Sequence, residues 1–377
     1  MKTQIITTEQ ELIAIKDSWN DLVRNNPETN APFFSWDWFY HSWLHFGKPS
    51  HWELSVVTVA EGLRVVGILP LVRWVSKSCG VSYRLLGFCD VGMLPRNMIY
   101  FDVLSDCELV FREIWAKLFL DKSSWDMIEL VNIPELSRFH KFCLDPKNLV
   151  RSALIRRQGF NAPIIELGGT LDDYFEMLDS KARKDLRRRM RKFKDYGDAK
   201  NLRFFEKREE IDEGLQMLFE VHRRSWKGEF SNPHYIDFYK EITAVLSERG
   251  EVIIAAAILN TKPISAGYIL TNNDTYFSLI NDHDTQFREL APGMILFVHE
   301  LDYLIKSGKK KFDFCGTTYD YKERLSNNNI NHSTFQIFHN GFKSRFIYSA
   351  KTFWLPCIRK ILRKQEPNDL IEKIEYQ

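Results

Sequence analysis

The chain has 377 residues, more than one compact hydrophobic core usually holds, so two domains are expected. Its formal net charge is only +2, which excludes a polyanion binder that acts through overall charge and leaves such a role to local patches. Because the six cysteines form no C-x-x-C pair, we expect neither a metal site of the zinc type nor a disulfide framework.

The first half of the chain alternates helix-like and strand-like patterns. In chain order, the predicted elements are a helix over 9–23, an aromatic segment over 32–43, strands over 53–60 and 63–72, a helix over 108–120 and a strand over 125–131. The Glu61-Gly62 pair joins the first two strands as a tight hairpin. The clustered tryptophans Trp36, Trp38, Trp43 and Trp52 are interpreted as core residues rather than as a platform for sugars.

A strongly basic helix is predicted between the two halves. Thr170-Leu-Asp-Asp173 reads as a capping-box start, and an apolar stripe continues along one long helix through Leu171, Phe175, Leu178, Ala182, Leu186, Met190 and Phe193. The other faces carry Lys181, Arg183, Lys184, Arg187, Arg188, Arg189, Arg191, Lys192 and Lys194. Two interpretations stay open, a solvated face or a face that contacts an anion such as a phosphate-bearing carrier, RNA or a membrane surface.

The second half repeats the order of the first half. Its predicted elements are a helix over 233–242, strands over 251–259, 264–270 and 276–280, a turn over 288–293, a helix over 294–305 and a strand over 311–315. The repeated order favours a duplicated fold, and two unrelated α+β domains are the alternative.

The turn over 288–293 is the most informative local feature, because it stands where a strand passes into a helix. Free N–H groups and the helix dipole at such a point attract an anion. A purely structural interpretation also fits, since Pro292 near the first helical position and Gly293 ease the start of a helix without any ligand.

Five short motifs, in this order and spacing, support a family assignment. They are Pro32-Phe-Phe-Ser35 with Trp38 and Trp43, Ser180 to Arg187, His222 to Trp226, Leu290-Ala-Pro-Gly293, and Phe312-Asp-Phe-Cys-Gly316 with Tyr321-Lys322. Together they resemble the GCN5-related N-acyltransferase (GNAT) superfamily, in its duplicated branch of CelD-like and BioF2-like acetyltransferases and Fem peptidoglycan aminoacyltransferases. The resemblance implies an α/β fold of tandem GNAT-like domains, each a mixed, mostly antiparallel sheet flanked by helices, over residues 1–165 and 166–377.

The resemblance also implies an acyl-CoA site in the second domain. In the superfamily, an Arg/Gln-x-x-Gly-x-Gly/Ala turn holds the coenzyme A pyrophosphate by backbone N–H groups. The aligned residues are Arg288, Ala291 and Gly293, so Leu290 and Met294 join them as predicted cofactor-binding residues. Alanine replaces the first glycine and Pro292 lacks an N–H, so the turn is poorer than the full pattern.

Asp313, Tyr321 and Lys322 are the predicted catalytic residues. Asp313 suits a general base or a tie that holds its loop. Lys322 suits a donor to the carbonyl oxygen or a phosphate, and Tyr321 suits a group that orients the amine or protonates the leaving thiolate. Arg183, Arg187 and Trp226 are the predicted substrate-binding residues.

The predicted function is N-acyl transfer, with acetyl moved from acetyl-CoA to an amine of a sugar, a polysaccharide precursor or a related metabolite. One alternative is a Fem-like enzyme that takes an aminoacyl group from tRNA, and another is a non-catalytic accessory protein that binds polyanions or membranes. Without a signal peptide or a long apolar run, a cytoplasmic location is expected. The apolar and basic segments over 341–348 and 353–364 suggest either peripheral membrane contact or a packed terminal helix.

Overall fold

The computed structural model describes residues 1–78, 80–89, 107–145, 147–148, 152–196, 200–226, 233–316, 319–354 and 371–375. The chain forms two compact units, residues 1–160 with 331–377, and residues 161–330. We expected the second domain to continue to residue 377, but residues 331–377 belong to the first unit. The reason lies in strand pairing, because His332 to Ile337 bond antiparallel to residues 128–134 of that unit. Most of the segment over 353–364 lies outside the described residues.

The first unit contains two sheets, one of them the small sheet β1-β3-β4. Its elements are β1 (Lys2–Ile6), α1 (Glu9–Ala14), α2 (Lys16–Asn25), η1 (Pro32–Phe34), α3 (Trp36–Ser42), η2 (Trp43–Gly47), β2 (Glu53–Leu54), β3 (Val56–Glu61), β4 (Arg64–Leu69), β5 (Leu71–Ser78), β6 (Val81–Phe88), α4 (Glu108–Leu120), β7 (Met127–Pro134), α5 (Arg138–Leu144), the start of β8 (Ser152–Glu166), most of β14 (Asn328–His339), α12 (Phe342–Ser349), η4 (Ala350–Trp354) and β15 (Ile371–Glu375). Trp36, Trp38 and Trp43 are buried, as the core interpretation requires, whereas Trp52 is half-buried and stacks on Trp74.

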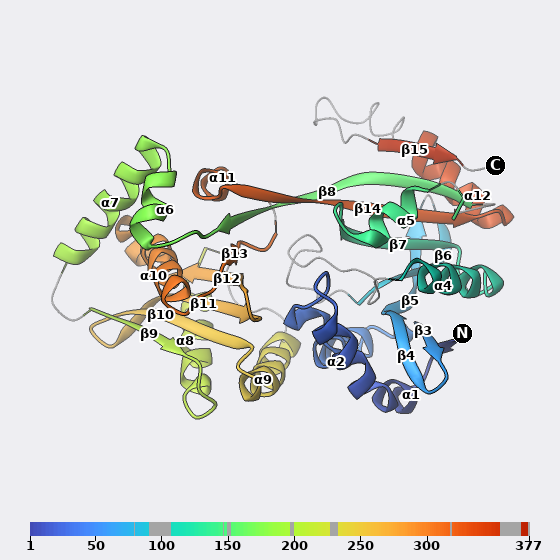
Figure 1. Cartoon of the computed structure of the whole chain (residues 1–377), viewed down its shortest axis with the longest axis horizontal. Helices are drawn as coiled ribbons and strands as arrows, with labels where there is room; N and C mark the ends of the chain where they lie inside the picture. The colour runs from blue at the N-terminus through green and yellow to red at the C-terminus, as the bar shows by residue number, and fades with distance from the viewer. Residues whose placement is uncertain are drawn as a thin grey trace. The chain divides into compact units, whose positions relative to one another are not determined.

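The second unit is a sheet with helices on both faces (Figure 1). After the end of β8, its elements are α6 (Leu171–Met177), α7 (Ser180–Asp195), β9 (Lys200–Phe205), α8 (Ile211–Arg223), α9 (Pro233–Glu248), β10 (Val252–Leu259), β11 (Lys262–Thr271), β12 (Thr275–His283), η3 (Thr285–Leu290), α10 (Pro292–Lys306), β13 (Lys311–Asp313) and α11 (Asp320–Leu325). The strands are ordered β8-β13-β12-β11-β10-β9. Pairing is antiparallel except between β12 and β13, which are parallel.

The two units share a strand–helix–strand arrangement. In the first unit β6 and β7 are parallel neighbours with α4 between them in the chain, and in the second unit β12 and β13 are parallel neighbours with α10 between them. A parallel pair needs such a crossover helix, whereas the antiparallel pairs around it need only short turns. The predicted duplicated α/β fold, with mixed and mostly antiparallel sheets, is confirmed.

The predicted single helix over 171–193 is wrong, because α6 and α7 are separate helices. Leu178 is extended with ψ of 148°, and Asp179 begins a new helix by accepting hydrogen bonds from the N–H groups of Lys181 and Ala182. The predicted capping box at Thr170 and Asp173 is present. The apolar residues of both helices still pack into one core with α10, so the apolar stripe is buried although the helix is broken.

Two neighbouring residues of β11 show which helices cover which face of the sheet in the second unit. Gly267 lies against Glu300 of α10, and a Cβ atom at Gly267 would be 2.4 Å from Glu300 Oε1. The Tyr268 hydroxyl instead lies 2.9 Å from Thr243 Oγ1 of α9. Because alternate strand residues point to opposite faces, α10 covers one face together with α6 and α7, and α9 covers the other with α8 (Figure 1).

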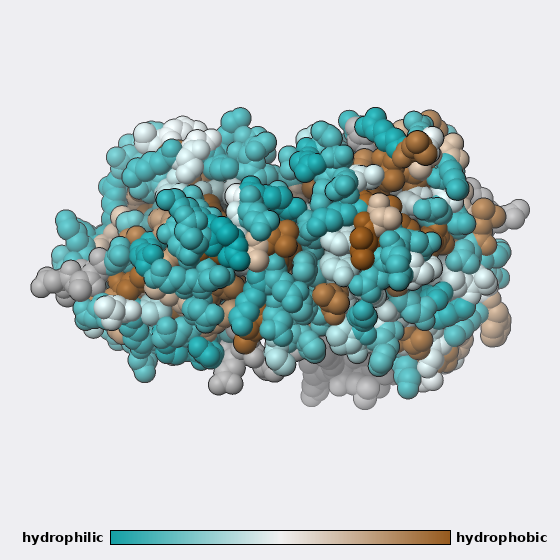
Figure 2. Space-filling model, turned by 90° about the horizontal axis from the view of Figure 1, so that it is seen from below, coloured by the Kyte–Doolittle hydropathy of each residue, from teal (hydrophilic) through white to brown (hydrophobic). Residues whose placement is uncertain are grey.

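On the face shown in Figure 2, hydrophobic side chains appear as small patches between hydrophilic ones. Among the described residues, no helix has both the length and the apolar character needed to cross a membrane.

Candidate functional site

The start of α10 has the backbone geometry of a tight strand-to-helix turn. Asp284 begins η3 by accepting a hydrogen bond from Gln286 N–H at 3.0 Å, and Ala291 follows in the left-handed conformation with φ of 50°. Gly293 then approaches β12 closely, because a Cβ atom there would lie 2.9 Å from Asn281 Oδ1. Asn281 in turn donates through Nδ2 to the Gly293 carbonyl at 3.3 Å. A side chain at 293 would therefore force the Asn281 side chain to move.

Few backbone donors are open at this helix start. The N–H groups of Met294 and Ile295 both bond to the Ala291 carbonyl, at 2.9 and 3.1 Å, and Pro292 has no N–H. Within the described part of the chain, the Gly293 N–H has no backbone acceptor. The predicted cofactor turn therefore keeps one N–H donor without a backbone acceptor among the described residues, together with the positive end of the helix dipole. The Arg288 side chain is exposed, whereas the Leu290 side chain is buried in the core.

The residues after β13 form a constrained loop that brings the predicted catalytic residues Asp313 and Lys322 together. Cys315 is left-handed with φ of 42°, and its N–H donates to Asp313 Oδ1 at 2.8 Å. Lys322 Nζ donates to the carbonyl oxygens of Phe314 and Cys315, at 3.0 and 3.3 Å. Asp313, Cys315 and Lys322 are all buried. Burial and the Asp313 carboxylate hold the pKa of Cys315 well above its usual range, so its thiol is not poised as a nucleophile.

Tyr321 is more accessible than Asp313, Cys315 and Lys322. Its ring stacks with that of Tyr319 at a centroid distance of 6.2 Å and an angle of 11°. Although 42% of Tyr321 is exposed, partial desolvation raises its pKa to about 12. The hydroxyl therefore keeps its proton at neutral pH and does not act as a base there.

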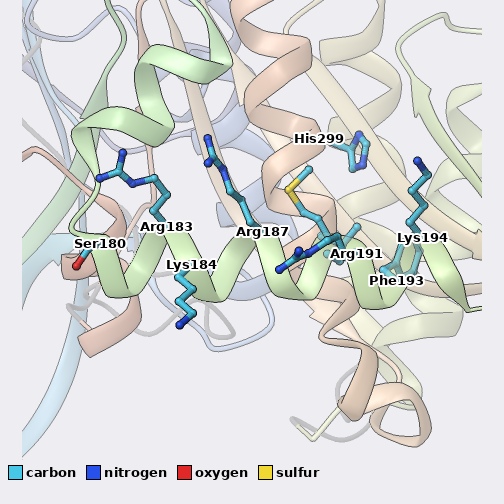
Figure 3. A pocket seen from close by; sticks show the side chains of 10 residues that line it. Ser180, Arg183, Lys184, Arg187, Arg191, Phe193, Lys194 and His299 are labelled. Atoms are coloured by element: carbon cyan, nitrogen blue, oxygen red, sulfur yellow. The ribbon is translucent and has the colours of Figure 1, made fainter.

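A cavity of about 930 Å³ lies between α7 and α10. Its lining consists of Ser180, Arg183, Lys184, Arg187, Met190, Arg191, Phe193, Lys194, Ile295 and His299. In Figure 3, the side chains of Arg183, Arg187 and Lys194 project to the side of α7 on which His299 stands, and Lys184 projects away from it. Two of the three predicted substrate-binding residues, Arg183 and Arg187, thus share one cavity.

Trp226, the third predicted substrate-binding residue, does not line that cavity. It follows α8 and is 70% exposed. The end of α8 is tied to the end of β12 by a hydrogen bond from Thr285 N–H to the Arg224 carbonyl at 3.2 Å. Near this tie, His222 Nδ1 and Asp282 Oδ2 are 2.5 Å apart and both side chains are buried. The motif from His222 to Trp226 gave no sign of the Asp282 contact, because the two residues are 60 positions apart.

Comparison with known proteins identifies the class. Residues 180–323 match the model of the acetyltransferase (GNAT) domain family. The structure resembles that of FemX with a TM-score of 0.59 and 12% identity, covering 93% of this chain and 99% of that one. It also resembles a conserved protein of unknown function from Bacteroides thetaiotaomicron VPI-5482 (TM-score 0.57, 10% identity, 89% and 100% coverage). No curated protein matches the chain in sequence.

A third similar structure is the C-terminal domain of a putative lysylphosphatidylglycerol synthetase from Agrobacterium fabrum, with a TM-score of 0.53, 9% identity, and coverage of 90% of this chain and 96% of that one. At these identities the structures bear on the fold alone. The domain match defines an acyltransferase of the GNAT type, and the chain as a whole shares its fold with FemX. Within this chain, residues 180–323 form the acetyltransferase (GNAT) domain.

Proposed function

We propose that this acyltransferase moves an acyl group, acetyl as the first expectation, from acyl-CoA to an amine of a sugar, a polysaccharide precursor or a related metabolite. The observation that carries the choice of donor is the start of α10. There the left-handed Ala291 turns the chain, and the Gly293 N–H has no backbone acceptor among the described residues. The absence of a side chain at Gly293 lets the backbone lie close to Asn281. That backbone, placed after a strand and before a helix, is suited to a diphosphate.

The residues at the turn fit a diphosphate in part. The Gly293 N–H and the helix dipole attract an anion, and the exposed Arg288 adds a cationic side chain close by in the chain. Ala291 and Pro292 remove flexibility and one donor relative to the full superfamily pattern. We therefore expect acyl-CoA to bind more weakly here than at a turn with both glycines.

Acyl transfer breaks the thioester C–S bond while a C–N bond forms, and the amine gives up a proton while the thiolate takes one. We propose Tyr321 as the proton donor to the thiolate, because its side chain is accessible and its hydroxyl can donate a hydrogen bond to the leaving sulfur. Asp313 and Lys322 are proposed to act through position, because Asp313 accepts from the Cys315 N–H and Lys322 donates to the carbonyl oxygens of Phe314 and Cys315. Trp226 and the arginines of α7 remain the proposed substrate contacts.

A second candidate keeps the fold and changes the donor to an aminoacyl group carried by tRNA. The similarity to FemX over 93% of the chain favours it, as does the basic face of α7. A non-catalytic accessory protein is the third candidate. That candidate predicts salt-sensitive anion binding through α7 and no thermal shift with any acyl-CoA.

Calorimetric titration with acetyl-CoA tests the donor proposal. The wild type is expected to bind acetyl-CoA, and Gly293→Glu is expected to lose about 100-fold or more in affinity. The new side chain would meet Asn281 and would place a negative charge at the single open N–H. Release of free thiol in the presence of glucosamine, measured with the same samples, then reports transfer.

Gln286→Glu is the matched control, because it adds the same charge to an exposed position of η3 and leaves the α10 start intact. It is expected to bind acetyl-CoA within about threefold of the wild type. No binding by the wild type would exclude acyl-CoA as the donor. Equal binding by wild type and Gly293→Glu would move the donor site away from α10.

A further inference from the structure

The cations of α7 fall into two groups that differ in their partners. Arg188 and Arg189 both bond to Asp185, at 2.6 and 2.7 Å, and Lys192 pairs with Glu289 at 3.6 Å. None of these three lines the cavity between α7 and α10. The cavity is instead lined by Arg183, Arg187 and Arg191, for which the described residues supply no carboxylate partner.

Spacing along the helix arranges the cavity arginines in a row. Arg183, Arg187 and Arg191 are four residues apart, so they share one face of α7 and are separated by about 6 Å along its axis. Figure 3 shows Arg183 and Arg187 projecting to the same side, toward the wall that contains His299. Like charges on one helix face repel one another, so an unneutralised row of this kind is stabilised when an anion binds along it.

The rest of the cavity is apolar. Phe193 and Ile295 are buried, Met190 is half-buried, and all three line the same space as the arginines. Burial lowers the pKa of His299, so this wall adds a neutral imidazole and no further positive charge at neutral pH. The volume of about 930 Å³ lies within the usual range of small-molecule sites.

We propose that the cavity between α7 and α10 binds a diphosphate joined to an apolar or aromatic group, at a site separate from the turn at the start of α10. Guanidinium groups bind phosphate oxygens in pairs, so the arginine row takes the diphosphate, and Met190, Phe193 and Ile295 contact the attached group. Nucleotides and isoprenoid lipids both present this chemistry. This cavity is distinct from the proposed acyl-CoA turn. Its α10 lining consists of Ile295 and His299, and no residue from 288 to 294 lines it.

Titration with three probes in magnesium-free buffer tests this site: inorganic pyrophosphate, uridine diphosphate and farnesyl diphosphate. Arg187→Gln is expected to lose about tenfold or more in affinity for the tightest probe. Arg188→Gln is the matched control, because it removes the same charge from the next residue, which is also exposed but is ion-paired to Asp185. The control is expected to stay within about twofold of the wild type.

Arg183→Gln repeats the test, because Arg187 also lies 5.5 Å above the ring of Phe175 and its loss can affect packing. Met190→Gln is expected to weaken the two probes that carry an attached group and to leave pyrophosphate unchanged. The tighter of those two probes distinguishes a nucleotide from a lipid source.

Three results would overturn the proposal: no probe binds the wild type at millimolar concentration, Arg187→Gln and Arg188→Gln lose equal affinity, or acetyl-CoA competes with the bound probe. Competition would make the cavity part of the donor site. Failure of acetyl-CoA to bind at all would reject the donor proposal and leave the result for the diphosphate probes unaffected.

Discussion

Replacing Glu300 by glutamine is expected to stabilise the protein at pH 8 relative to the wild type, by roughly 4 kcal/mol, and to have little effect near pH 4.5. Glu300 is fully buried on α10, and neither carboxyl oxygen has a hydrogen-bond partner among the described residues. The carboxyl group occupies space opposite Gly267, where a side chain would collide with it. Burial raises the pKa of Glu300 from 4.5 to about 8.

The direction of this change in the free energy of unfolding follows from proton binding by the folded and unfolded chains. Between the ordinary pKa and about 8, the unfolded chain loses the Glu300 proton while the folded protein keeps it. Unfolding is therefore favoured progressively as pH rises through this interval, by about 1.4 kcal/mol per pH unit. Glutamine is uncharged in both states, so this contribution disappears.

Urea unfolding at pH 5, 6.5 and 8 measures the difference. The free energy of unfolding of Glu300→Gln minus that of the wild type should increase with pH across the three conditions. Glu289→Gln is the control, since Glu289 is 92% exposed and its substitution should give a nearly constant difference. A constant difference for Glu300→Gln would show that Glu300 is ionised in the folded protein.

Replacing Lys322 by methionine is expected to lower the free energy of unfolding by roughly 3 kcal/mol and to reduce acyl transfer at least about 100-fold. The methionine side chain has a length similar to that of lysine but cannot donate a hydrogen bond. The carbonyl oxygens of Phe314 and Cys315 would therefore lose the hydrogen bonds that Lys322 Nζ donates to them. The left-handed Cys315 depends on these bonds and on the bond from its N–H to Asp313. Release of this loop would also displace Tyr321, which precedes Lys322 in the chain.

Urea unfolding and thiol release, each compared with Lys306→Met, check both effects. Lys306 is 72% exposed and pairs with Asp302 on the surface of α10, so its loss should cost under about 0.5 kcal/mol. An inactive Lys322→Met protein of unchanged stability would mean that Lys322 acts on the substrate directly. Full activity of that variant would remove Lys322 from the site.

Local patterns predicted elements well where the chain itself contains the signal. The helix over 108–120 has the bounds of α4, and the predicted hairpin at Glu61-Gly62 joins β3 and β4, because alternation, helical spacing and turn residues act over a few positions. The strand, turn and helix around Arg288 to Gly293 were predicted for the same reason. The roles of Arg288, Asp313, Tyr321 and Arg183 in a reaction stay predictions.

The break between α6 and α7 shows where periodicity is insufficient. The apolar stripe continues through Leu178 at helical spacing, so the pattern predicts one helix, yet Asp179 caps a new helix. When apolar residues at helical spacing both precede and follow an aspartate, the sequence does not show whether that aspartate caps a new helix or lies within a continuous one. In the folded protein, both segments pack on one core as two separate helices.

By itself, the sequence determined elements such as α4, the β3–β4 hairpin and the strand, turn and helix around α10, and the basic character of residues 181–194, because these depend on neighbours within a few positions. The tertiary structure alone decided which cation of α7 meets Glu289 and which cations line the cavity, that Glu300 is buried opposite Gly267, and that residues 331–337 complete the first unit. Each of the latter depends on contacts between residues that folding brings together from distant segments or adjacent helix faces, and such contacts leave no periodic trace in the chain.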